Sequence, residues 1–118
     1  LLAFNHIHQR RIRIMEKKCC ICGTIFDEHG HNALPIKKGT CCNKCNETFA
    51  FYARLYSNPE KLSVTYTVCP TKEIFKTNSK LLSKNNFYHT GMMHVMSCFH
   101  NDETEEDVIL VPGYINKE

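Results

Sequence analysis

The sequence predicts an α+β fold in which a small four-cysteine module is followed by a strand–helix–strand–strand unit. Two Cys-x-x-Cys pairs near the start of the chain predict the module. After Pro59, apolar residues first alternate with a period of two and then recur at helical spacing, which predicts the second unit. A length of 118 residues suits one domain. We expect an N-terminal arm at 1–14, the cysteine module at 15–59 and the second unit at 60–118, packed on the module in one compact body.

The paired cysteines predict a zinc site. Nineteen residues separate the pair Cys19/Cys22 from the pair Cys42/Cys45, a spacing typical of four-thiolate zinc sites. Two residues between cysteines allow a tight turn to direct both sulfurs at one ion, and four thiolates complete its tetrahedral shell. We therefore expect one structural zinc ion bound by these four cysteines. Because no coordination position stays open for water, we expect the chain not to be an enzyme.

Two further cysteines leave the choice of ligands open. Cys20 and Cys41 each neighbour a predicted ligand and could replace it, although a Cys-x-Cys pair from Cys20 and Cys22 is less regular. We interpret both as packed thiols. A disulfide framework is the other alternative, but the metal-type spacing favours reduced cysteines and a cytoplasmic setting. No apolar run approaches the ~20 residues of a transmembrane helix, so no membrane partner is expected.

The second cysteine pair runs into a predicted helix over residues 46–56, which Pro59 limits. Its inner face is expected to hold Phe49, Tyr52, Ala53 and Tyr56. A knuckle, a hairpin and a helix that carries the second pair follow the order of a treble clef. A zinc ribbon would place a strand after the second pair instead.

The doubled cysteines at 19–20 and 41–42 belong to a pattern that resembles one found in other proteins. Cys-Cys-Ile-Cys-Gly at 19–23 and Gly-Thr-Cys-Cys-Asn-Lys-Cys-Asn at 39–46 resemble a pattern near the start of small uncharacterised proteins of tailed phages and bacteria. The resemblance covers about residues 15–57. It implies a zinc-binding protein of viral or bacterial origin, and it implies no activity.

The segment between the pairs is expected to form a hairpin. Ile25 and Phe26 begin a short strand, residues 27–32 form a turn, and residues 33–36 return as a strand. His29 and His31 raise an alternative function, because a treble clef with His and Asn near its hairpin can be a nuclease with a second, catalytic metal. Such nucleases also carry a ligand histidine on the following helix, which has none here.

Beyond Pro59, alternating apolar residues predict a strand that ends at Pro70, and Thr71 is a suitable N-cap for a helix through about Lys84. The inner side of that helix is expected to hold Ile74, Phe75, Asn78, Leu81 and Leu82. Asn85-Asn86 suits a left-handed stop of this helix.

Four lysines at four-residue spacing on the predicted helix form one basic ridge, named here the lysine ridge: Lys72, Lys76, Lys80 and Lys84.

The remaining chain is expected to add strands. Residues 87–100 predict one strand, or two that break at Gly91, and residues 108–111 predict the last. The preceding helix is long enough to connect parallel neighbours. A second metal site is conceivable from Cys69, His94, Cys98 and His100, although lone cysteines are more often buried apolar residues.

Charge is unevenly distributed along the chain. The net charge is only +3, but residues 37–84 hold nine basic and three acidic residues, and residues 101–118 hold six acidic residues and one lysine.

We expect a zinc-stabilised binding module that contacts nucleic acid or a nucleic-acid-processing protein. The alternative is a protein-binding factor, either an inhibitor of a host enzyme or a minor component of a larger assembly. The candidate contact residues are Arg10, Arg11, Arg13, Lys72, Lys76, Lys80, Lys84, Phe51 and Tyr56.

Overall fold

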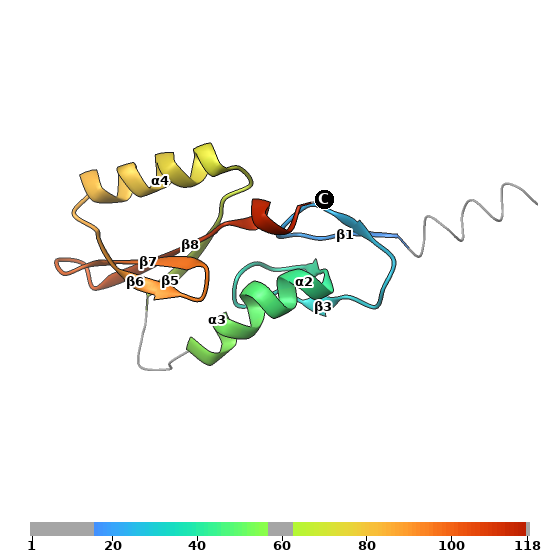
Figure 1. Cartoon of the computed structure of the whole chain (residues 1–118). Coiled ribbons are helices and arrows are strands. Elements are labelled where there is room, and N and C mark those ends of the chain that lie inside the picture. The colour runs from blue at the N-terminus through green and yellow to red at the C-terminus, as the bar shows by residue number, and fades with distance from the viewer. Residues whose placement is uncertain (1–15, 57–62, 118) are drawn as a thin grey trace, which may run out of the picture.

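The computed structural model describes residues 16–56 and 63–117 (Figure 1). It has the predicted α+β class, with the cysteine module first and a four-stranded sheet after it. In chain order the elements are β1 (Lys17–Lys18), β2 (Ile25–Phe26), β3 (His31–Asn32), β4 (Thr40–Cys41), α2 (Asn43–Cys45), η1 (Asn46–Ala50), α3 (Phe51–Tyr56), β5 (Val64–Val68), α4 (Lys72–Lys84), β6 (Tyr88–Met93), β7 (Met96–Asn101), β8 (Glu106–Val111) and η2 (Gly113–Asn116).

Two short antiparallel ladders form the first half of the module, β1 with β2 and β3 with β4. The predicted strand at Ile25 and Phe26 is confirmed. The predicted return strand at 33–36 is wrong, because this segment is a turn and the strand lies before it, at β3. The Ile36 N–H donates to the Ala33 carbonyl at 3.0 Å, so these backbone groups are used within the turn. Ala33 and Ile36 still point into the core.

One continuous helical run, α2–η1–α3, carries the second cysteine pair. Cys42 is its N-cap and Cys45 lies in its first turn. The middle segment, η1, is π-helical, with the Phe51 N–H bonded to the Asn46 carbonyl five residues back. Phe49 is fully buried, as are Ala50 and Ala53. The knuckle and helix therefore have the treble-clef-like arrangement that the sequence predicted.

The second half is a four-stranded sheet in the order β5-β8-β7-β6. β5 runs parallel to β8, whereas β7 runs antiparallel to both of its neighbours. The predicted break at Gly91 is wrong, because Gly91 lies inside β6 at a register shift and the chain reverses at His94 and Val95. Gly91 (φ +151°) and His94 (φ +56°) both have positive φ, so each absorbs an irregularity of the hairpin.

Helix α4 connects the two edge strands, β5 and β6, and has the predicted bounds. The Thr71 hydroxyl accepts a hydrogen bond from the Ile74 N–H at 3.1 Å, and Asn86 stops the helix with φ +68°. Its inner side differs in part from the prediction. Phe75, Asn78 and Leu82 are half-buried, but Ile74 is 41% exposed and Leu81 50% exposed. No residue of α4 is buried, so the helix covers its sheet face only loosely.

The sheet is the middle layer of three. Alternate residues of β7 and β8 point to opposite faces, as strand geometry requires. Met96, Cys98, Ile109 and Val111 belong to the larger core cluster, which they share with the cysteine module. Phe99 and Leu110 form a smaller cluster with Cys69, covered by Phe75 and Leu82 of α4. Figure 1 shows α4 on one side of the sheet and α3 on the other.

The end of the chain returns to the cysteine module. After β8, η2 brings the C-terminus beside β1 (Figure 1). Gly113 packs so closely there that a Cβ atom on it would lie 2.5 Å from the Ile21 carbonyl oxygen. In the part of the chain that the structure describes, no helix combines the length and apolar composition that a membrane crossing needs.

Candidate metal centre

Four cysteine sulfurs converge between the knuckle and the start of the helical run. The Sγ atoms of Cys19, Cys22, Cys42 and Cys45 all lie within 4.8 Å of one another, and the four residues are buried. The Cys22 and Cys42 sulfurs are 3.9 Å apart. Four thiolates at about 2.3 Å from a tetrahedral ion would lie about 3.8 Å from each other. The group has the size and chemistry to hold a metal ion.

Backbone hydrogen bonds shape the first half of this centre. The N–H groups of Ile21 and Cys22 both donate to the Cys19 sulfur at 3.4 Å. The Gly23 N–H donates to the Cys19 carbonyl at 2.9 Å, and Gly23 takes φ +81°, which a side chain would disfavour. This turn directs two sulfurs to the same point and stabilises negative charge on one of them.

The second half is built by the start of the helical run. The Asn46 N–H donates to the Cys42 carbonyl at 3.0 Å, so Cys42 closes the first turn as its N-cap. Cys45 lies one turn further along and is fully buried. Residues three apart at a helix start lie on one face, which explains why a Cys-x-x-Cys pair suits this position.

A hydrogen bond between the Cys19 and Cys45 side chains shifts the pKa values of both thiols. A hydrogen bond with the Cys45 side chain, assisted by backbone N–H groups, outweighs desolvation and lowers the pKa of Cys19 to about 4. The same contact raises the pKa of Cys45, because its proton is held between the two sulfurs. Thiolates are the form of cysteine that binds metals. The centre therefore already holds part of the negative charge that a cation would neutralise.

Cys20 and Cys41 lie outside this group of sulfurs. Burial raises the pKa of Cys41 to about 12 and also raises the pKa of Cys20. Both are therefore neutral thiols at physiological pH. Cys41 is fully buried in the larger core cluster, and Cys20 packs against that cluster, in keeping with their interpretation as packed thiols.

Asn116 also contacts the centre, and no sequence signal pointed to it. Its Nδ2 group donates to the Cys45 sulfur at 3.5 Å. A donor to a ligand sulfur orients the ligand and tunes its charge. Because Asn116 follows Cys45 by 71 residues, only the path of η2 brings the two together.

The second metal site considered from the sequence is not assembled. Among residues 16–56 and 63–117, only the four-cysteine group places one ligand atom from each of three or more residues all within 4.8 Å of one another. Cys69 belongs to the smaller core cluster and Cys98 to the larger one, on opposite faces of the sheet. His94 instead stacks on Tyr52, with ring centroids 4.3 Å apart.

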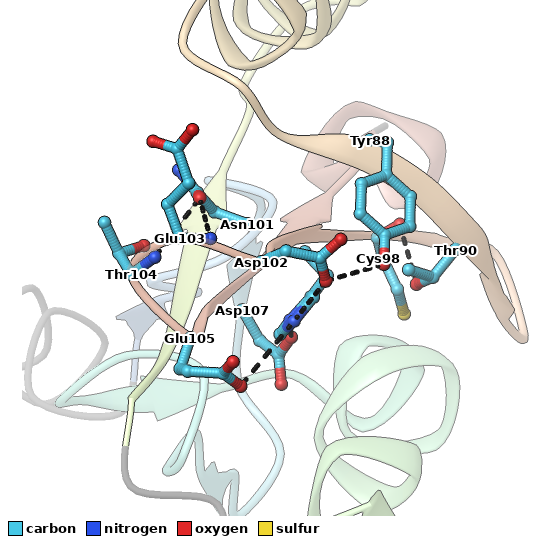
Figure 2. Close-up of polar contacts among 10 residues, drawn as sticks. Tyr88, Thr90, Cys98, Asn101, Asp102, Glu103, Thr104, Glu105 and Asp107 are labelled. Carbon is cyan, nitrogen blue, oxygen red and sulfur yellow. Dashed lines mark hydrogen bonds and ion pairs between the residues drawn. The ribbon is translucent and has the colours of Figure 1, made fainter.

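Figure 2 shows Asp102, Glu105 and Asp107 near one another at the β7–β8 hairpin, and His100 lies among these carboxylates. Its Nδ1 atom is 2.6 Å from an Asp107 oxygen, and its Nε2 atom is 3.3 Å from Asp102 and 3.9 Å from Glu105. The hydrogen bond to Asp107 raises the pKa of His100, with further contributions from the neighbouring charges. The Tyr88 hydroxyl donates to Asp102 at 3.1 Å, which extends the network across the sheet.

The histidines of the nuclease alternative do not form a ligand set. His31 Nε2 is 2.6 Å from the Asn43 side-chain oxygen, and His29 is exposed. Neither belongs to a group of potential metal ligands within the described ranges. The geometry thus gives no support for the second, catalytic metal that this alternative requires.

The predicted contact residues lie in different surroundings. All four residues of the lysine ridge are exposed on α4. Phe51 is 50% exposed on α3, whereas Tyr56 is half-buried against the larger core cluster. Arg10, Arg11 and Arg13 lie outside the described residues. The lysine ridge is therefore the candidate contact surface that the structure presents most completely.

Comparisons with protein-family models, curated proteins and solved structures find no match to this chain. The functional proposal therefore depends on the cysteine centre and the surface around it.

Proposed function

We propose that this chain is a zinc-stabilised module that binds nucleic acid through the lysine ridge of α4. Zinc is the proposed ion because four soft thiolates at tetrahedral spacing suit it. Native mass spectrometry of the purified chain should find one zinc ion per molecule. A chain that folds without a metal, or that prefers a hard cation, would contradict this part of the proposal.

The observation that supports the nucleic-acid target is the exposure of all four ridge lysines on a helix that buries none of its residues. From Lys72 to Lys84 the helix rises about 18 Å. A duplex strand places a phosphate about every 3.4 Å along its axis, so the ridge can reach several successive phosphates. Lysine contacts of this kind position a protein on the backbone and carry no sequence preference.

Fluorescence anisotropy with short labelled DNA and RNA at increasing salt tests this target. Four phosphate contacts predict a slope of log K against log salt of about −3 to −4 on duplex DNA. The double variant Lys76→Gln/Lys80→Gln should reduce the slope by about two. Lys38→Gln/Lys44→Gln removes the same charge from the cysteine module and should leave the slope within about one of the parent. If both double variants reduced the slope equally, or if the parent did not bind at low salt, the lysine ridge would be refuted as the contact surface.

A protein-binding role is the second candidate, and one observation favours it. Phe51 is 50% exposed and Leu55 69% exposed on the outer side of α3. Exposed apolar and aromatic residues on one helix are common at protein contacts. This candidate includes capture of a host enzyme and membership of a larger assembly, in keeping with the phage or bacterial resemblance. The protein-binding role would be favoured over nucleic-acid binding if the chain bound one protein at high salt and lost this binding in Phe51→Ala.

A further inference from the structure

A groove beside the knuckle is lined by lysines from distant parts of the chain. It has a volume of about 540 Å³ and runs between the knuckle, the end of β5 and the C-terminal tail. Lys18 precedes the first cysteine, Lys37 follows the turn at 33–36, and Lys117 follows η2. The lining contains no acidic residue. Cys19 and Cys22 of the cysteine centre also line the groove. Four thiolates around a divalent ion leave two negative charges, fewer than the three positive charges of these lysines, so the groove keeps an excess of positive charge.

The lysines are free to bind an anion. All three are exposed, and none forms an ion pair with another residue of the described chain. Lys18 is held over the knuckle, because a Cβ on Gly23 would lie 3.9 Å from its Cε atom. The Lys117 N–H donates to the Tyr114 carbonyl at 3.2 Å, which fixes the start of that side chain.

The walls of the groove favour a ligand with an apolar part as well as a charge. Ile21, Val68 and Pro70 line it together with the lysines. A cavity of several hundred Å³ with a few convergent polar groups is typical of small-ligand sites. Lysine ammonium groups bind phosphates as point charges, whereas the apolar wall suits a sugar or a base.

We propose that this groove is a phosphate-binding site for a nucleotide, in which Lys18, Lys37 and Lys117 bind the phosphate and the apolar wall contacts the rest. The nucleotide has two sources, a free nucleoside monophosphate or one unit of a nucleic-acid strand. The inference does not depend on the lysine ridge of α4. Pro70 of the groove stands two residues before Lys72, the first residue of that ridge.

Titration of the zinc-loaded full chain with adenosine monophosphate, followed by amide NMR, tests the site. We expect saturable shifts centred on Gly23 and Lys117. Lys37→Gln and Lys117→Gln should each weaken binding about tenfold, or about 1.4 kcal/mol, because each loses one charge-assisted contact to the phosphate. Lys38→Gln is the matched control, because Lys38 is exposed next to Lys37 and does not line the groove. It should change the affinity less than twofold.

Three results would overturn the site. The first is the absence of saturable shifts, and the second is equal weakening in Lys37→Gln and Lys38→Gln. The third is a loss of bound zinc in the Lys37 and Lys117 variants with no change in nucleotide affinity, because the lysines would then serve only to balance the cysteine centre.

A short oligonucleotide without a terminal phosphate distinguishes the two sources. Tighter binding than the monophosphate in the same groove would identify a nucleic-acid strand, and binding of the monophosphate alone would identify a free nucleotide. Both outcomes support the site. Lys76→Gln/Lys80→Gln should not alter monophosphate affinity, so failure of the lysine ridge and failure of this groove are separate results.

Discussion

Asn116 donates a hydrogen bond from Nδ2 to the Sγ atom of Cys45 over a distance of 3.5 Å. The bond connects the last turn of the chain to a cysteine at the start of the helical run. The candidate metal centre is therefore completed by residues of both halves of the chain. It follows that loss of the C-terminal turn should affect metal binding, although that turn supplies no ligand.

Replacement of Asn116 by Leu should weaken zinc binding. The variant keeps the number and branching of the side-chain heavy atoms and removes the donor to the Cys45 sulfur. Loss of an outer partner of a ligand commonly costs about 10–100-fold in metal affinity. Competition with a chromophoric chelator measures the change. Ile115→Ala alters the adjacent, 46% exposed residue of the same turn and should keep the parent affinity. Equal affinities in the Asn116 variant and the parent would show that the bond has no role in metal binding.

Cys42→Ser should release the metal and unfold the cysteine module, whereas Cys41→Ser should retain it. Cys42 supplies one of the four converging sulfurs, and Cys41 does not. Binding of a structural zinc ion contributes about 10–16 kcal/mol in zinc-finger peptides, comparable to the whole stability of a domain. Zinc content by mass spectrometry and thermal melting measure both effects.

Cys20→Ser extends the same comparison and should also keep the metal. Because Cys20 and Cys41 each neighbour a predicted ligand, their variants are matched controls for Cys42→Ser. Retention of zinc in Cys42→Ser, or its loss in Cys41→Ser, would require a different set of ligands.

Local signals in the sequence were sufficient to predict which cysteine sulfurs converge and where α4 begins and ends. Cysteine spacing predicted which sulfurs converge because the geometry of a Cys-x-x-Cys turn is set by neighbouring residues. The N-cap at Thr71 and the stop at Asn86 were predictable for the same reason, since both depend on hydrogen bonds and φ angles within one turn.

Features that depend on distant contacts could not be predicted. The apolar residues at 33–36 predicted a strand, but the segment is a turn that buries Ala33 and Ile36 and leaves Leu34 exposed. This arrangement depends on the packing of the whole module. Helical periodicity predicted that Ile74 and Leu81 lie on the inner side of α4. The core cluster beneath the helix is small and does not include them, so both are exposed. Asn116 and the three lysines of the groove are brought to the knuckle by tertiary structure, which no spacing encodes.

Gly113→Ala should destabilise the fold. The added Cβ would lie 2.5 Å from the Ile21 carbonyl oxygen, which belongs to the backbone and cannot rotate away. Overpacking of this kind typically costs about 1–3 kcal/mol. Urea denaturation of the zinc-loaded chain measures the loss, and an exposed substitution such as Glu103→Ala should stay within about 0.5 kcal/mol of the parent. A Gly113 variant as stable as the parent would show that η2 can shift away from the knuckle at little cost.

His100 should make the stability of the sheet dependent on pH. Its pKa is raised in the folded chain, chiefly by the hydrogen bond to Asp107, and Asp102 and Glu105 lie within 3.9 Å of the same ring. A raised pKa means that the folded state binds the proton more tightly than the unfolded state does. The stabilisation is therefore complete below the unfolded value of about 6.5 and is lost as pH rises through the folded value.

Replacement of Asp107 by Asn should remove most of this dependence, because Asp107 supplies the largest contribution to the raised pKa of His100. The free energy of unfolding by urea, measured from about pH 6 to pH 8, should fall with pH in the parent and change less in the variant. NMR titration of the His100 ring should show a lower pKa in the variant. His29→Gln removes an exposed histidine outside these carboxylates, and its pH profile should follow that of the parent. Identical profiles for the parent and Asp107→Asn would show that this pair does not cause the pH dependence.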